Sequence, residues 1–115
     1  MNAPILPEAD AEIQAAAQWY QNRQAGLGEQ FLEELVDALL AIEKHPRHAP
    51  LYTQLKTRRE IRQRSLPRFP YHVIYEVRED EIVIIAVAHA HRRRIIGVSD
   101  FRWRFALDTA RKRAG

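Results

Sequence analysis

The sequence predicts an α+β fold in which an N-terminal antiparallel helical hairpin packs on a three- to four-stranded, mainly antiparallel sheet, followed by a helical or extended tail. Apolar residues recur at helical spacing up to Lys44, and from Ile61 onward they follow the twofold alternation of strands. In addition, a chain of 115 residues can bury one core but not two. We therefore expect one domain, with residues 1–98 as its main part and residues 99–115 as a C-terminal extension.

Two helices are expected in the N-terminal half. The first begins at Pro7, which a first turn tolerates, and ends before Gly26. The second runs from about Gly28 to Lys44. Its wide apolar face comprises Phe31, Leu32, Leu35, Val36, Leu39, Leu40 and Ile42. Its polar face comprises Glu29, Glu33, Glu34 and Asp37. The short link between the two helices predicts an antiparallel hairpin.

Three strands are expected after the helices. Ile61 to Leu66 is a weak, arginine-rich strand. Tyr71 to Arg78 alternates apolar and polar residues, which predicts a strand with one buried face. Ile82 to His89 is apolar on both faces, which predicts a central strand. Ile5 and Leu6 add a further edge strand, whose pairing is limited by the proline before them.

The C-terminal tail fits two structures. Its apolar residues alternate as in a strand: Phe101, Trp103, Phe105 and Leu107. Alternatively, Ser99 or Asp100 caps a helix that reaches Lys112. We favour the helix, because the closing arginine and lysine residues complement the negative end of a helix dipole.

The charge of the chain is divided between its two halves. Residues 1–55 carry 3 basic and 8 acidic groups, a net charge of −5, and residues 56–115 carry 15 and 7, a net charge of +8. The basic groups of the second half are almost all arginines, which make planar, bidentate contacts with phosphate or carboxylate. An acidic partner is therefore expected, either a nucleic acid or an acidic peptide.

Several classes of protein are disfavoured. The chain has no cysteine, so no disulfide, thiolate nucleophile or cysteine-ligated zinc is expected. The first residues lack the pattern of a signal peptide. The longest apolar run, Ile82 to Ala88, is far shorter than the roughly 20 residues that cross a bilayer. We expect a cytoplasmic protein that binds no membrane, no metal and no cofactor.

Four segments in order along the chain carry recognisable motifs: Glu12–Tyr20, Gly26–Phe31, Arg68–Val77 and Ile84–His89. Together they resemble members of the RelE/ParE toxin superfamily, in particular ParE-like toxins of plasmid stabilisation systems. The resemblance runs from about Pro7 to Arg94. After His89 the basic stretch of relatives is kept, but the proline that usually follows it is missing.

The same segments have expected structural roles. Trp19 and Tyr20 are predicted to pack between the hairpin and the sheet. Gly26 and Gly28 supply backbone freedom at the turn. The two tyrosines of the Tyr71–Val77 segment are expected to fill the sheet face under the helices.

The resemblance implies the toxin of a type II toxin–antitoxin system. Such a toxin inhibits growth by binding an essential target, for which we favour DNA gyrase. Its partner would be a cognate antitoxin, a DNA-binding protein with a disordered tail, and a homodimer or a toxin–antitoxin hetero-oligomer is the expected assembly. The alternatives are a ribosome-dependent, metal-independent mRNA endonuclease of RelE type and a non-toxic nucleic-acid-binding module.

The candidate site residues follow from these alternatives. RNA cleavage needs a base, an acid and a cationic clamp. His89, His91 and Arg92 are the main catalytic candidates, and His72 and Glu60 are further candidates by residue type. Because no convincing acid–base pair emerges, we favour a non-catalytic toxin. Binding of the target or antitoxin is expected to involve eight residues: Arg59, Arg62, Arg64, Arg68, Arg92, Arg93, Arg94 and Trp103.

Overall fold

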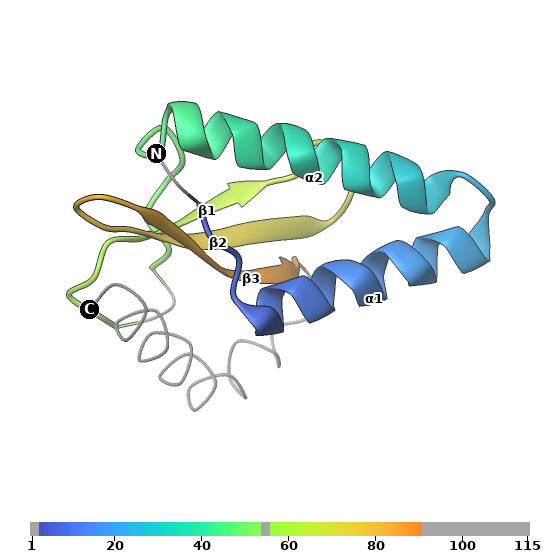
Figure 1. Cartoon of the computed structure of the whole chain (residues 1–115), viewed down its shortest axis with the longest axis horizontal. Coiled ribbons are helices and arrows are strands. Elements are labelled where there is room, and N and C mark those ends of the chain that lie inside the picture. The colour runs from blue at the N-terminus through green and yellow to red at the C-terminus, as the bar shows by residue number, and fades with distance from the viewer. Residues whose placement is uncertain (1–2, 54–55, 91–115) are drawn as a thin grey trace.

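The computed structural model describes residues 3–53 and 56–90. Its elements are α1 (Pro7–Arg23), α2 (Leu27–Lys44), β1 (Ile61–Ser65), β2 (Tyr71–Val77) and β3 (Ile82–His89). The two helices form a hairpin on one face of an antiparallel sheet whose strand order is β1-β2-β3 (Figure 1). The predicted α+β class and the predicted order of elements are confirmed. None of the described helices is long and apolar enough to cross a membrane.

The turn between the helices depends on two glycines. Gly26 has φ of 88°, in the left-handed region that favours glycine. Gly28 plays a different part, because a Cβ at this position would lie 2.6 Å from the carbonyl oxygen of Ala17 in α1. The Gln21 side chain accepts hydrogen bonds from the N–H groups of Gly26 and Gly28, both at 3.1 Å. Gly28 therefore permits the close approach of the two helices, and Gln21 caps the second.

Gly28→Ala is expected to destabilise the fold by about 1 kcal/mol, because the cost of overpacking at this contact exceeds the gain in helix propensity. Chemical denaturation of both proteins measures the difference. Glu29→Ala, at the exposed neighbouring position, is the control and should leave the unfolding free energy nearly unchanged. Equal stability of Gly28→Ala and the parent chain would show that the helices can separate without cost.

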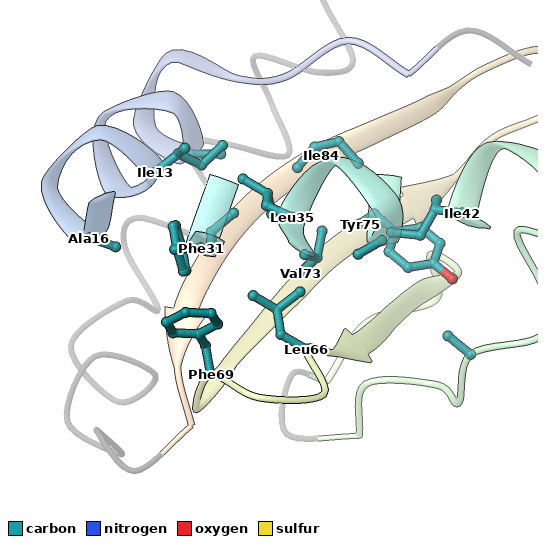
Figure 2. Close-up of a cluster of buried hydrophobic side chains, with 14 of the residues drawn as sticks. Ile13, Ala16, Phe31, Leu35, Ile42, Leu66, Phe69, Val73, Tyr75 and Ile84 are labelled. Atoms are coloured by element: carbon teal, nitrogen blue, oxygen red, sulfur yellow. The ribbon is translucent and has the colours of Figure 1, made fainter. Parts of the chain in front are cut away.

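The main core lies between the hairpin and the sheet (Figure 2). Phe31 is fully buried, and the centre of its ring lies 5.5 Å from the ring centre of Tyr20 and 5.4 Å from that of Phe69. The prediction for Tyr20 is therefore confirmed, whereas that for Trp19 is wrong. Trp19 is 49% exposed, and the Arg23 guanidinium lies 4.4 Å from the centre of its ring. Trp19 therefore belongs to the surface of α1 and not to the core.

The predicted apolar face of α2 is too wide. Leu35 and Ile42 are buried, but Leu32, Val36 and Leu40 are 37%, 51% and 51% exposed. Successive residues of a helix are rotated by 100° about its axis, so only the arc centred on Phe31, Leu35, Ala38 and Ile42 reaches the sheet. Glu34, assigned to the polar face, lies on the buried arc and is only 8% exposed.

Strand β2 is buried on both faces, so the prediction of a single buried face is wrong. Val73, Tyr75 and Val77 face the helices. Ile74 faces the other way, in a second apolar cluster that also contains Leu6, Tyr52, Ile61, Val83, Ile85, Ala86 and Ala88. Glu76 is buried beside it, where Arg59 and Arg78 pair with its carboxylate. An ion pair thus lets a polar residue occupy a buried position of the strand.

The apolar sequence of β3 predicted a central strand, and β3 is central only when the N-terminal bridge between Ile5 and Ile84 is counted. Among the three strands it lies at one side of the sheet, and β2 is the middle strand. Its outer edge is covered, because the Leu6 N–H donates to the Ile84 carbonyl at 3.0 Å and the Ile84 N–H donates to the Pro4 carbonyl at 2.9 Å. The predicted N-terminal edge strand is present as this one parallel bridge, between Ile5 and Ile84.

Candidate partner-binding site

Two arginines near the outer strand are held in internal ion pairs. Arg59 donates to the Glu76 carboxylate at 2.8 Å. Arg62 donates to the Glu60 carboxylate at 2.8 Å and to the carbonyl oxygen of Ala49 at 2.7 Å. Each side chain is less than a fifth exposed. Arg59 and Arg62, both predicted to bind a partner, are thus already neutralised and partly buried.

Glu60 is a poor candidate for a general base. Its carboxylate accepts two hydrogen bonds from Arg47, both at 2.9 Å, in addition to the one from Arg62. Burial alone would raise the pKa of Glu60, but the hydrogen bonds and charges of these two arginines outweigh it and hold the pKa below its usual value of 4.5. A carboxylate of this kind has little tendency to take up a proton at neutral pH.

Arg64 and Arg68 line a cleft between the end of β1 and helix α2. The cleft is completed by Glu34, Asp37, Ala38, Ser65 and Pro67. Arg64 is paired in register with Val73, so its side chain lies on the helix side of the sheet. Within residues 3–53 and 56–90, Arg64 is half-buried and has no hydrogen bond or ion pair. Its positive charge is therefore available to a ligand.

The buried carboxylate of Glu34 holds Arg68 in position. One oxygen of the Glu34 carboxylate accepts the Arg68 backbone N–H at 2.7 Å, and the other accepts Nε at 2.7 Å. Burial would raise the pKa of Glu34, but these hydrogen bonds and the charge of Arg68 outweigh it and lower the pKa. The Arg68 side chain is nevertheless 67% exposed. Glu34 thus fixes the start of the side chain while the end of the guanidinium faces outward.

A second hollow lies between α1 and the ends of β2 and β3. Its aromatic lining residues are Trp19, Tyr20, Tyr71 and His89, and the remainder of the lining is Glu12, Ala15, Ala16, Pro70 and Val87. The Tyr71 and His89 rings meet edge to face, with their centres 5.1 Å apart. The hollow shares no lining residue with the Arg64–Arg68 cleft. Rings of this kind favour contact with an apolar or aromatic side chain.

The histidines of the sheet do not form an acid–base pair with each other. His89 is paired with Tyr71 and lies on the helix side. His72 follows Tyr71 in the strand and therefore points to the opposite face, where its Nδ1 lies 2.9 Å from the Ser65 hydroxyl. His89 also lines a different hollow from Arg64. Among the described residues, His89 is thus separated from His72, although His72 shares a third hollow, at the turn between β1 and β2, with Arg68 and Tyr71.

Five of the predicted site residues lie outside the described part of the chain. They are His91, Arg92, Arg93, Arg94 and Trp103. Within residues 3–53 and 56–90, no group of three or more His, Asp or Glu side chains is arranged to hold a metal ion.

Comparison with known protein families gives a match over most of the chain. The model of the ParE toxin of the type II toxin–antitoxin system parDE matches residues 5–94. The chain belongs to the ParE toxin family. The matched range contains the helices and strands that the structure describes, together with the residues that line the Arg64–Arg68 cleft and the hollow beside α1.

A solved structure shows the same fold as this ParE-family chain. It is described as the chromosomal ParDE TA system from P. aeruginosa, and it matches with a TM-score of 0.58 at 18% sequence identity. The alignment covers 79% of this chain and 97% of the other. No significant match was found among curated proteins.

Sequence reasoning missed two carboxylates that shape the ParE-family site. Glu34 was placed on the solvent face of α2, although its spacing from Phe31 and Ala38 matches that of the core residues. Glu12 accepts a hydrogen bond from the Val87 N–H at 2.9 Å and so fixes α1 against the outer edge of β3. No pattern in the sequence indicates this second contact, because it joins segments that are far apart in the chain.

Proposed function

We propose that this type II toxin arrests bacterial growth by binding DNA gyrase, and that a cognate antitoxin neutralises it by laying an acidic segment along the Arg64–Arg68 cleft. Membership of the ParE family supports the toxin role. The observation that carries the binding mode is the unpaired, half-buried guanidinium of Arg64 beside the exposed guanidinium of Arg68. The toxin is expected to act in the cytoplasm.

The two guanidiniums suit a carboxylate ligand. Arg68 cannot swing freely, because Glu34 holds its Nε and its backbone N–H. An incoming carboxylate can therefore bind a preset donor without much loss of side-chain entropy. Asp37 at the rim of the same cleft disfavours a bare phosphate backbone that follows the whole surface. An acidic peptide side chain between Arg64 and Arg68 fits this pattern of charge.

A non-nucleolytic action is supported by the separation of the catalytic candidates. His89 lies in the hollow beside α1, and Glu60 lies between two arginines. His72 lies on the far face of the sheet, in a hollow that contains Arg68 but neither His89 nor Glu60. General acid–base catalysis requires these groups within hydrogen-bond reach of one reacting site. A toxin that acts by binding its target does not require acid and base groups to lie close together.

The choice of target is tested by two assays run side by side. The purified toxin should inhibit supercoiling by DNA gyrase and leave ribosome-bound mRNA intact. The variants His89→Ala and Arg92→Ala should likewise leave the mRNA intact. Cleavage of mRNA that either substitution abolishes would contradict the proposal and establish the ribonuclease alternative. Salt-sensitive RNA binding without growth arrest would instead indicate a nucleic-acid-binding module.

Arg64→Glu is expected to weaken the complex with the antitoxin encoded beside the toxin by about tenfold or more, since a carboxylate then meets a carboxylate. Arg58→Glu is the matched control, because Arg58 is an exposed arginine before the opposite end of β1. Isothermal titration calorimetry at physiological salt measures both affinities, and growth rescue in cells reports the same order. Equal weakening by the two substitutions would show that the antitoxin responds to overall charge and not to the cleft.

A further inference from the structure

Helix α2 carries a row of exposed apolar side chains on the surface that faces away from the sheet. Leu32, Val36 and Leu40 are four residues apart and therefore lie in line along the helix. Leu32 and Leu40 are eight positions apart, which corresponds to a rise of about 12 Å along the helix. Single exposed leucines are common on protein surfaces, but a continuous row is typical of a surface that packs against another helix.

An acidic row runs beside the apolar one. Glu29, Glu33 and Asp37 are also four residues apart, and all three are exposed. The rotation of 100° per residue places the acidic row between the apolar row and the Arg64–Arg68 cleft. Asp37 lines that cleft, which agrees with this order around the helix. The apolar row therefore has a strongly acidic border on one side.

The acidic border limits which kinds of molecule can pack on the apolar row. A nucleic acid would be repelled by the three carboxylates. A second copy of the chain, packed antiparallel with α2 against α2, would bring two acidic borders close together, with Lys44 as a single compensating charge at the end of each helix. A helix that carries lysine or arginine along one flank gains both apolar burial and ion pairs.

We propose that the Leu32–Val36–Leu40 row is a docking site for an amphipathic helix of a partner protein, with an apolar stripe at three- and four-residue spacing and basic residues along one flank. This surface is distinct from the Arg64–Arg68 cleft and goes beyond the proposed toxin function. The partner's apolar stripe packs on the row, and its basic flank lies over Glu29 and Glu33. The partner helix binds with its basic flank on the side of the row that carries Glu29 and Glu33.

The probe for this site is a synthetic, helix-stapled peptide with leucines at three- and four-residue spacing and lysines along one flank, titrated with the full chain by fluorescence anisotropy. The parent chain is expected to bind it, and the double variant Val36→Ser, Leu40→Ser to bind about tenfold more weakly. Leu51→Ser is the matched control, because Leu51 is 53% exposed and lies outside α2. It should bind as the parent chain does.

Charge reversal tests the role of the acidic border. Glu29→Lys, Glu33→Lys should weaken binding of the lysine-flanked peptide and strengthen binding of an otherwise identical glutamate-flanked peptide. The proposal is overturned if the parent chain binds both peptides equally, or if Leu51→Ser loses as much affinity as the double variant. It is also overturned if sedimentation shows a dimer that Val36→Ser, Leu40→Ser abolishes. Arg64→Glu should leave peptide binding unchanged, which separates this outcome from that of the proposed function.

Discussion

Phe31→Ala is expected to lower the free energy of unfolding by about 3 to 5 kcal/mol, because it truncates a fully buried aromatic side chain. The Phe31 ring is fully buried where α2 meets the sheet, and it lies 5.3 to 5.5 Å from three other aromatic rings, those of Tyr20, Phe69 and Tyr71. Truncation removes the transfer free energy of the ring and leaves a cavity that these rigid neighbours cannot fill. For a domain whose total stability is about 5 to 15 kcal/mol, this loss would unfold a large part of the population on mild heating.

Denaturant unfolding followed by tryptophan fluorescence measures this loss. Leu32→Ala is the matched control, since Leu32 is the next residue of the same helix and is partly exposed. It should cost about 0.5 kcal/mol or less. Similar losses for Phe31→Ala and Leu32→Ala would mean that the arc of α2 facing the sheet is assigned incorrectly.

Glu34→Ala is expected to cost about 2 to 3 kcal/mol, because it removes two hydrogen bonds to a buried carboxylate and leaves the Arg68 N–H without its acceptor. The exposed Arg68 guanidinium can return to water, which keeps the loss below that of a fully buried ion pair. Glu33→Ala, at the adjacent exposed position, should be nearly neutral. The same denaturation experiment compares the three proteins. A cost for Glu34→Ala no greater than that for Glu33→Ala would refute the anchoring role.

The contribution of Glu34 also depends on pH. Its pKa is lowered from 4.5 in the folded state, so the unfolded chain binds a proton more readily than the folded one. The stabilisation is therefore fully present above about pH 4.5 and is lost as the pH falls through the lowered pKa. The difference in unfolding free energy between the parent chain and Glu34→Gln should shrink below pH 4.5. A difference that stays constant down to pH 2 would indicate that the charge of Glu34 plays no part.

Much of the fold was predictable because its elements are local. The proline at the start of α1, the glycines of the link and the change from helical to alternating spacing mark the boundaries of the elements directly in the sequence. Short connections then leave few topologies for two helices and three strands. The same short connections predict an antiparallel meander with β2 in the middle, as observed. The burial of both faces of β2 was less predictable, because His72 and Glu76 give one face a polar sequence.

The candidate site was less predictable than the fold. The sequence indicates which residues are arginines but not which of them already have a carboxylate partner. Arg59 and Arg64 look alike in the sequence, yet the first is paired with Glu76 and the second is unpaired within the described chain. Such pairs join residues that are distant in sequence, as with Arg68 and Glu34, so their effect on a surface can be seen only in three dimensions.

The contact between Glu12 and Val87 has a consequence for synthesis of the chain on the ribosome. These residues are separated by 75 positions, and α1 packs against β3, the last of the three strands. The helical hairpin therefore emerges early but has no completed sheet to cover until residue 89 has left the exit tunnel. Nascent chains that stop before this point expose the apolar arc of α2, which makes them substrates for chaperones and proteases. Folding of the whole domain is therefore coupled to the end of its translation, because its first helix and its last described strand stabilise each other.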